Sequence, residues 1–248
     1  MSALLLALLA GAVVGLALGA LGGGGSVLAV PALIYALGFS PVAATTASLV
    51  IVVATSLAAL LAHARDGNVR WRTGLLFTAA GVVPAMLGGL AAARLPSPAL
   101  TAAFALLAGV AAVRMLRPAR TAAREGPVPP LRAGAAGAGL GGVTGVLGVG
   151  GGFLAVPALV GVVRLPMRAA VGTSLLVITV NSVAALATRA GAVNGLDWGL
   201  IAPFAGAAVL GAWDGKRLAA RLSGGALQRV FAVVLLAVAA FMLADTVI

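Results

Sequence analysis

The stretch LGGGGSVLAVPAL, Leu21–Leu33, interrupts an apolar run with four consecutive glycines and places a proline six residues after the last of them. A similar stretch, LGVGGGFLAVPAL, occurs at Leu147–Leu159. The six residues LAVPAL are identical in the two copies, and Pro31 and Pro157 lie 126 positions apart. The chain therefore interrupts its hydrophobic pattern twice in nearly the same way, which indicates an internal repeat.

The composition is that of a membrane protein. Of the 248 residues, 62% are hydrophobic and 8% are charged, and the mean hydropathy is +1.18. Soluble domains carry about 25% charged residues, so this chain lacks the polar surface that a soluble globule needs. Several apolar stretches approach or exceed the ~20 residues that a helix needs to cross the hydrocarbon core. The sequence therefore predicts an all-α polytopic membrane protein, since the two-residue alternation of a β-barrel is missing.

Cysteine usage and charge narrow the function classes. The chain has no cysteine, which excludes disulfides, thiolate catalysis and zinc–thiolate sites. The formal charge is +11, which we attribute to arginines at cytoplasmic helix ends beside anionic lipid, so no nucleic-acid partner is expected. The first 20 residues lack the basic start of a signal peptide and have a counterpart in mid-chain. We interpret them as a transmembrane helix of the mature protein.

The similarity between the two halves continues beyond the glycine runs. ATTASLV at Ala44–Val50 aligns with AVGTSLL at Ala170–Leu176, and SLAAL at Ser56–Leu60 aligns with SVAAL at Ser182–Leu186. Further along the chain, Asn68 aligns with Asn194, and the second half has one inserted residue before the alignment continues. We therefore divide a single transmembrane domain, 1–248, into repeat one (1–117), a Pro- and Arg-rich linker (118–131) and repeat two (132–248).

Each half contains five hydrophobic segments, and the second of them is short. The first half holds segments 2–20, 26–38, 41–64, 73–94 and 98–116, and the second holds 133–147, 153–164, 168–190, 198–215 and 225–247. Thirteen residues, as in 26–38, rise only about 20 Å as a helix. The short segments could cross obliquely, begin inside the membrane or be re-entrant.

The distribution of basic residues discriminates between these options. If every segment crosses and the linker is cytoplasmic, 14 basic residues fall inside and two, Arg94 and Arg189, fall outside. If the short segments are re-entrant, the count becomes 9 inside and 7 outside. The positive-inside rule favours the first arrangement. The sequence therefore predicts ten segments, both termini outside, and two inverted-topology repeats with broken helices at the Gly-rich motifs.

Inverted repeats with broken helices are typical of transporters, whose binding site lies near the membrane midplane where the repeats meet. A helix that starts after each glycine run would present unpaired N–H groups and the positive end of its dipole. Because glycine allows close approach of the backbone, two such starts would form an anion site without a buried arginine. Pro31 and Pro157 are expected to break the regular helix and free further backbone groups. Close packing of helices is the alternative role for the glycines.

The third segment of each half carries hydroxyl groups along an apolar helix, in TTASLVIVVATS (Thr45–Ser56) and GTSLLVITVNS (Gly172–Ser182). Hydrogen bonds from these hydroxyls to the preceding helical turn are the alternative to substrate binding. Asn181 is expected to face the bundle interior, because an amide is costly in lipid. The candidate substrate-binding residues are Gly23, Gly24, Gly25, Ser26, Thr45, Thr46, Ser48, Gly150, Gly151, Gly152, Gly172, Thr173, Ser174 and Asn181.

The paired motifs resemble the two signature regions of the TauE/SafE family, bacterial sulfite-exporter-like permeases. GALGGGGSVLAVPALIYALGFSPVAATTASL and GVLGVGGGFLAVPALVGVVRLPMRAAVGTSLLVITVNS carry the resemblance, which extends over essentially the whole chain. The resemblance implies transport of sulfite, sulfonates or related organosulfur anions across the cytoplasmic membrane, by export or by uptake. Ser26 stands where the second copy has Gly152, so the two halves are not chemically equivalent.

The positions of the acidic residues indicate what could drive transport. None of Asp66, Glu125, Asp197, Asp214 and Asp245 falls clearly at mid-membrane, where proton-coupled carriers often keep a carboxylate. A monoanion leaving a negative interior gains about 2.3 kcal/mol per 100 mV, so export would need no coupling ion. Two other options remain open: the substrate could carry its own proton, or the backbone alone could bind it. Asp214 is expected to pair with a basic neighbour, Lys216 or Arg217.

His63 is the only histidine, and we expect an interfacial residue at a helix end, with a proton relay as the alternative. A hydrolytic pair of Ser26 and His63 lacks the usual nucleophile motif, and the sequence has no P-loop or metal-ligand cluster. We therefore expect no enzyme activity and no cofactor, and partners limited to a small anion, the lipid bilayer and further copies of this chain. A channel or carrier for another small anion, or a scaffold subunit without transport, remains the alternative function.

Overall fold

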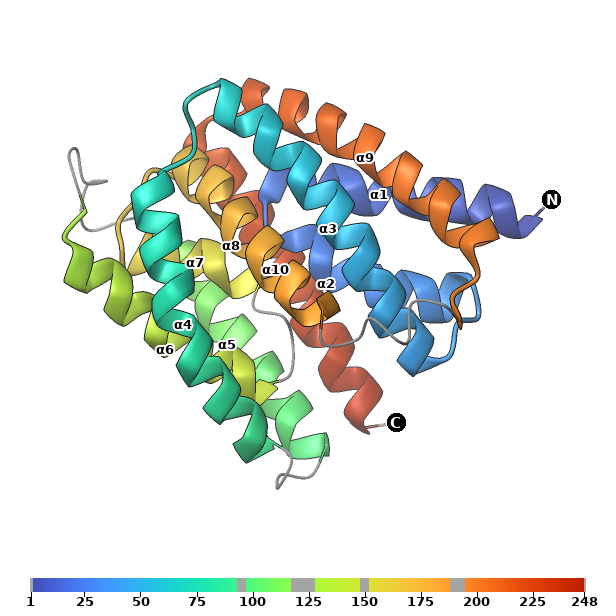
Figure 1. Ribbon diagram of the computed structural model, residues 1–248, viewed down its shortest axis with the longest axis horizontal. Coiled ribbons are helices and arrows are strands. Elements are labelled where there is room, and N and C mark those ends of the chain that lie inside the picture. Colours follow the sequence, from blue (N-terminus) through green and yellow to red (C-terminus); the bar gives the residue numbers. More distant parts are fainter. Residues whose placement is uncertain (1, 93–96, 117–127, 148–151, 188–194, 248) are drawn as a thin grey trace.

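The computed structural model describes residues 2–92, 97–116, 128–147, 152–187 and 195–247, and in these ranges the regular elements are helices (Figure 1). The first half forms α1 (Ser2–Leu21), α2 (Gly24–Pro31), the π-helical η1 (Ala32–Ala36), α3 (Pro41–Arg65), α4 (Trp71–Ala92) and α5 (Ser97–Leu116). The second half forms α6 (Pro130–Leu147), α7 (Gly152–Gly161), α8 (Met167–Ala187), α9 (Trp198–Arg221) and α10 (Gly224–Val247).

The predicted all-α membrane protein is confirmed, because each predicted hydrophobic segment forms a helix. Within the described ranges, four helices are long and apolar enough to cross a membrane, and the stretches that qualify are Ala3–Leu21, Ala43–Arg65, Met167–Ala187 and Gly224–Phe241. Most described helix boundaries lie within three residues of the predicted ones, and two differences have a clear cause. Helix α9 continues past residue 215 to Arg221, since lysine and arginine are good helix formers. Helix α6 begins at Pro130, inside the predicted linker, where the fixed φ of proline suits a first helical position.

The short helices follow the glycine runs. Helix α7 has 10 residues, a rise of about 15 Å, which is half of the hydrocarbon thickness. Helix α2 ends at Pro31, and the chain continues as the π-helical turn Ala32–Ala36. Proline lacks an N–H, so a change of helical hydrogen bonding at this point has a direct cause. Pro157 lies inside α7, which continues to Gly161, so this proline does not end its helix.

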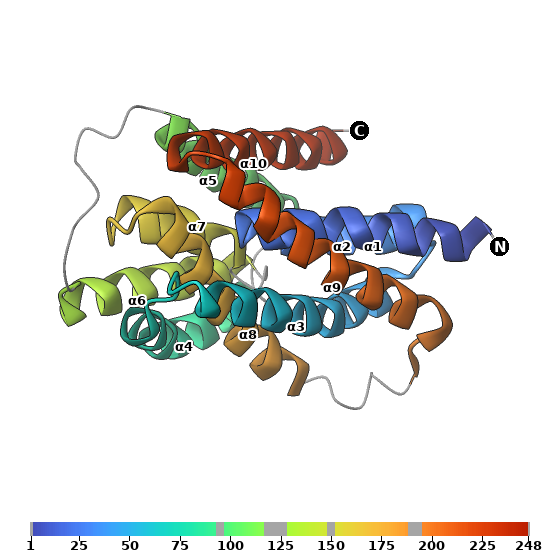
Figure 2. The same cartoon turned by 90° about the horizontal axis from the view of Figure 1, so that it is seen from above.

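The two short helices lie in the middle of the molecule and contact each other. Figure 2 shows them between the α5–α10 pair on one side and α3 with α8 on the other. Helix α2 contacts α3 and α10, and α7 contacts α8 and α5. Backbone that is not helical can be tolerated at membrane depth only where protein covers it, and this arrangement provides the cover.

Two helix pairs hold the molecule together through backbone contact, α1 with α9 and α4 with α6 (Figure 1). A Cβ atom on Gly15 would overlap the carbonyl oxygen of Ala208, and one on Gly141 would overlap that of Gly81. Such small-residue interfaces let membrane helices approach closely. Several glycines of α1, α6 and α9 therefore serve packing, the alternative role considered from the sequence, and further examples are Gly11, Gly19, Gly137, Gly211 and Gly215.

These contacts also relate the two halves. Gly11 lies against the Phe204 carbonyl, and Gly137 lies against the Phe77 carbonyl. Gly11 and Gly137 are 126 positions apart, and Phe77 and Phe204 are 127 apart because of the inserted residue. The two glycines therefore occupy corresponding positions in the two halves, as do the two phenylalanines, and the two helix pairs are equivalent. Helices α3 and α5 likewise pack on their own counterparts, α8 and α10, which supports the two-repeat interpretation.

In the described part of the chain, one side of the molecule brings together the ends of α3, α5, α7 and α9 and the starts of α4, α6, α8 and α10, and we call it the basic face. Lys216 of α9 binds Asp66 after α3 at 2.8 Å, and Arg168 of α8 donates to the Ala220 carbonyl at 3.1 Å. Gln228 of α10 donates to the Met115 carbonyl of α5 at 2.6 Å. Every lysine and arginine in the described ranges lies at these ends: Arg65, Arg70, Arg72, Arg114, Arg132, Arg164, Arg168, Lys216, Arg217, Arg221 and Arg229.

The chain direction alternates from helix to helix relative to this face. Helix α1 ends near it, because His63 Nε2 lies 3.1 Å from the Gly19 carbonyl oxygen. Helix α6 begins at it, so the first helices of the two halves run in opposite directions. Figure 2 shows both termini at the same end of the molecule, away from the starts of α6 and α8. This alternation supports the predicted ten segments and the inverted orientation of the halves.

We predict that Gly15→Ala lowers the stability of the protein, because its Cβ would meet the Ala208 backbone. Overpacking of this kind costs about 1–3 kcal/mol. Gly206→Ala on α9 is the matched control, since a Cβ there has no neighbour within 4 Å and alanine favours the helix. Thermal unfolding of the purified variants in detergent, followed by tryptophan fluorescence, measures the difference. Equal melting temperatures of the two variants would contradict the packing assignment.

Candidate functional site

The break between α1 and α2 consists of two buried glycines. Gly22 has φ of +74° and donates its N–H to the Leu18 carbonyl at 2.8 Å, which closes α1. Gly23 follows as the N-cap of α2 and supplies no side-chain cap. The left-handed backbone of Gly22 suits glycine alone among common residues. Helix α2 therefore begins inside the protein with no side chain at its cap position.

The other half of the chain encloses this break. A Cβ atom on Gly22 would lie 2.5 Å from Ser174 Oγ, 3.2 Å from the Val171 carbonyl oxygen and 3.3 Å from Val156 Cγ2. Val171 and Ser174 belong to α8, and Val156 belongs to α7, close to its start at Gly152. The first glycine break thus lies against the candidate residue Ser174 and near the start of the second short helix.

The remaining glycine-motif candidates are placed only in part. Gly24, Gly25 and Ser26 form the first turn of α2, and Gly152 begins α7. The Ser26 side chain lies outside the described part of the structure, as do Gly150 and Gly151 entirely. Their role in binding remains a prediction from the sequence.

The candidate serines of the third segments make equivalent hydrogen bonds. Ser48 Oγ donates to the Thr45 carbonyl at 2.8 Å, and Ser174 Oγ donates to the Val171 carbonyl at 2.8 Å. Both side chains are buried, as is Thr46, whereas Thr45 is half-buried. These are the bonds to the preceding turn that the sequence left open as the alternative. The backbone N–H groups at the start of α2 are therefore the clearest hydrogen-bond donors near the break.

Gly172 and Thr173 hold the connection between α3 and α4. A Cβ on Gly172 would lie 2.5 Å from the Asn68 carbonyl oxygen, so only glycine fits there. Thr173 Oγ1 accepts a hydrogen bond from the Arg70 N–H at 3.1 Å. Thr173 and Ser174 are adjacent, but the first contacts this connection and the second contacts the glycine break. Both candidates thus have a visible structural role, and substrate binding by them stays a prediction.

A polar contact between α3 and α8 was not predicted from the sequence. Thr179 Oγ1 lies 3.0 Å from Ser56 Oγ and 2.7 Å from the Leu175 carbonyl oxygen, and both hydroxyl groups are buried. Comparison of the halves could not reveal it, because Val53 stands at the position that corresponds to Thr179. Asn181, two residues further along α8, is half-buried, and no hydrogen bond of its side chain occurs within the described ranges.

His63 is buried rather than interfacial, with 5% of its surface exposed. Its Nε2 lies 3.1 Å from the Gly19 carbonyl oxygen, which can only accept, so Nε2 carries the hydrogen. Its Nδ1 has no partner among the described residues. The ring lines a cavity of about 60 Å³ together with Asp66, Asn68 and Arg168. His63 thus joins the last turn of α3 to the last turn of α1, just before the glycine break.

The acidic residues at the basic face are paired. Asp214 lies 3.3 Å from Arg217, one of the two predicted partners. Lys216 instead binds Asp66 at 2.8 Å and donates to the Ala62 carbonyl at 2.7 Å. Lysine on α9 can reach α3 because the two helices are in contact. The spacing of Lys216 from Asp214 along one helix gave no indication of this partner on another helix.

Comparison with known proteins places the chain in a family. The family model described as "Sulfite exporter TauE/SafE" matches residues 7–242. The chain belongs to the TauE/SafE family. Two relatives from Xylella fastidiosa, strains Temecula1 and 9a5c, are each described as "Probable membrane transporter protein" and are 36% and 35% identical over 250 aligned positions. The alignments cover 94% of this chain and 92% of each relative, so the TauE/SafE similarity includes both glycine motifs.

We predict that Gly22→Ala destabilises this TauE/SafE protein more than Gly38→Ala. Both glycines have positive φ, +74° and +71°, and an alanine in that conformation costs about 1–2 kcal/mol. Only Gly22 would in addition place its Cβ against Ser174 Oγ, whereas Gly38 has no neighbour within 4 Å. Thermal unfolding in detergent measures the loss of stability in each variant. Adding Ser174→Ala to Gly22→Ala should reduce the difference in stability loss between the two glycine variants. Equal losses in the two variants would show that the break is not closely covered by α8.

Proposed function

We propose that this chain is a secondary transporter that moves small sulfur-containing anions, such as sulfite and sulfonates, across the bacterial cytoplasmic membrane, with export as the favoured direction. Membership of the family described as sulfite exporters supports the substrate class. The transporter names of the two Xylella relatives support the activity. The basic face is then the cytoplasmic face, in accord with the positive-inside rule.

The observation that carries this proposal is the covered glycine break at Gly22 and Gly23. Helix α2 starts there without a side-chain cap, against α7 and α8 of the other half. The first N–H groups of a helix lack intrahelical partners and lie at the positive end of its dipole. An anion can accept hydrogen bonds from such N–H groups without a full positive charge beside it. Close packing alone would not require the chain to break and restart a helix inside the protein.

The distribution of charge supports a site built from the backbone. The described lysines and arginines all lie at the basic face, and the nearby hydroxyl of Ser174 already donates to a carbonyl. An anion at the break would therefore meet amide dipoles and hydroxyl oxygens, while Arg168 and Lys216 line the cavity beside Val171. Dipoles hold an anion less strongly than a buried cation would, which favours release. Sulfite and sulfonates present several S–O oxygens that can each accept a hydrogen bond.

The membrane potential supplies the energy in this proposal. A monoanion that leaves a negative interior gains about 2.3 kcal/mol per 100 mV. The described acidic side chains, Asp66, Asp197 and Asp214, lie beside or beyond helix ends or near the basic face, and two of them are paired with Lys216 and Arg217. None is placed in the middle of a helix bundle to take up a coupling proton.

The proposal predicts that purified protein in liposomes carries sulfite or a sulfonate faster than chloride. With a fixed membrane potential, flux should persist when the proton gradient is removed and should reverse when the potential is reversed. Sulfite, thiosulfate, two sulfonates and chloride form the panel, and empty liposomes provide the baseline. Flux of chloride alone would reject the substrate class, and loss of all flux on removing the proton gradient would reject the potential-driven mechanism.

We further predict that Gly25→Leu abolishes flux while the protein still inserts and remains folded. The proposal assigns the backbone N–H groups of this first turn to the anion, and a leucine adds bulk beside them. Gly225→Leu at the start of α10 is the matched control, because a Cβ there has no neighbour within 4 Å. The repeat predicts the same loss for Gly151→Leu. Full flux in both Gly25→Leu and Gly151→Leu would refute the proposed anion site.

A further inference from the structure

A groove of about 670 Å³ opens at the basic face, apart from the glycine break. It lies between the starts of α4 and α6 and the connection from α7 to α8. Neither the proposed anion site nor the transport mechanism uses it. Two of its lining residues are basic, one is a tryptophan, and most of the others are apolar: Arg70, Trp71, Arg72, Leu76, Val128 and Leu165 are the ones that matter below.

The two arginines of the groove have no acidic partner in the described ranges. Both are exposed, and neither forms an ion pair there. Asp66 is bound by Lys216, and Asp214 is bound by Arg217. Two unpaired guanidinium groups at one mouth of a groove favour an anionic ligand, and guanidinium binds phosphate with particularly good geometry.

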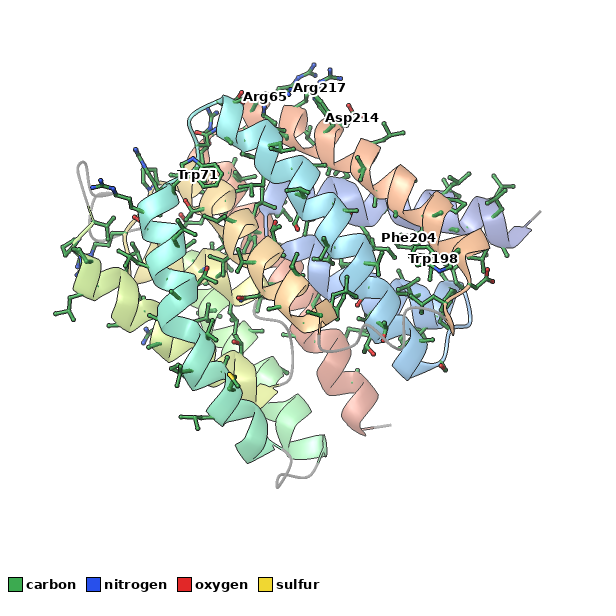
Figure 3. The ribbon with its side chains drawn as sticks, in the orientation of Figure 1. Arg65, Trp71, Trp198, Phe204, Asp214 and Arg217 are labelled. Atoms are coloured by element: carbon green, nitrogen blue, oxygen red, sulfur yellow. The ribbon has the colours of Figure 1, made fainter. Side chains whose placement is uncertain are left out.

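The rest of the groove is mostly apolar and continues into the exposed apolar surface of α4. Leu76 of α4 lines it and is 43% exposed, and the neighbouring Leu75 is 53% exposed. Trp71, 48% exposed, lies between the two arginines in sequence, and tryptophan is enriched at membrane interfaces. Figure 3 shows Trp71 at the edge of the molecule, at the same end as Arg65. The groove thus joins a basic rim to an apolar wall.

This combination discriminates between classes of ligand. A small hydrated oxyanion would use only the rim and would fill a minor part of about 670 Å³. An anionic glycerophospholipid has a phosphate for the arginines and an acyl chain for the apolar wall, and basic pockets between helices at the cytoplasmic side suit such headgroups. We propose that the groove binds one anionic glycerophospholipid of the adjacent leaflet, with its phosphate on Arg70 and Arg72 and its first acyl segment along Leu76 and Leu165.

Binding there would also stabilise the neighbouring structure. The Arg70 N–H donates to Thr173 Oγ1 at 3.1 Å, and the next residue, Ser174, lies against the glycine break. A lipid that fixes the start of α4 therefore strengthens the contact of α4 with α8. The lipid site is independent of the transported substrate, so binding can be measured without any transport assay.

Native mass spectrometry of the full chain in detergent tests the proposal, with phosphatidylglycerol and phosphatidylcholine as competing probes. The unmodified chain should retain one phosphatidylglycerol in preference to phosphatidylcholine. Arg70→Gln with Arg72→Gln should weaken that binding by about thirtyfold, because each basic side chain near anionic lipid contributes about a factor of five. Arg221→Gln with Arg229→Gln is the matched control, with the same change of charge at the same face but outside the groove.

A second pair of variants tests the apolar wall. Leu76→Ser should weaken phosphatidylglycerol binding, whereas Leu75→Ser, beside the groove but not lining it, should leave it unchanged. Equal retention of the two lipids by the unmodified chain would overturn the proposal. So would equal losses in the two arginine double variants, which would indicate diffuse attraction by the whole basic face. Complete displacement of the lipid by millimolar inorganic phosphate would show that the groove recognises the anion alone.

Discussion

Backbone contact within the α1–α9 and α4–α6 pairs is the interaction on which the rest of the structure depends. In hydrocarbon there is no hydrophobic force to drive one apolar helix onto another, so association relies on close van der Waals contact. Gly15 and Gly141 provide that contact, because any Cβ there would overlap a carbonyl of the partner helix. The two pairs lie on either side of α3, α8 and the short helices (Figure 1).

Close packing of these two helix pairs allows the chain to contain broken helices. A broken helix exposes N–H and carbonyl groups, each costly in lipid unless protein covers it. Gly22 is buried against Val156, Val171 and Ser174, all from the other half of the chain. The polar backbone in the middle of the molecule is therefore kept from lipid by the same contacts that hold the halves together. A site for an anion can then exist there without a buried charge.

The two halves share the same helix packing but differ in their polar groups. Thr179 makes a buried contact with Ser56, while Val53 occupies its corresponding position. His63 reaches the end of α1, while its counterpart in the second half is Arg189. Repetition of apolar and glycine positions preserves helix packing, whereas the polar positions have diverged. The two halves consequently present different polar groups at corresponding positions.

The sequence by itself determined the class, the helical segments and the position of the first glycine break, and it predicted the repeat. These depend on local composition and on periodic patterns, which a single chain displays directly. It also indicated that the α1 and α6 glycines serve packing, though as an alternative rather than a conclusion. The positive-inside count favoured ten alternating segments, and the clustering of Arg65, Lys216 and their neighbours at one face supports that choice.

Only the tertiary structure decided which residues meet. Lys216 binds Asp66 on another helix, Thr173 holds the α3–α4 connection while its neighbour Ser174 covers the glycine break, and His63 is buried against Gly19. These contacts join positions that are far apart in the chain, and they depend on the rotation and crossing of each helix. Hydrophobic pattern fixes which side of a helix is apolar, but in lipid both sides are apolar, so the partner of each polar group is set by the packing alone.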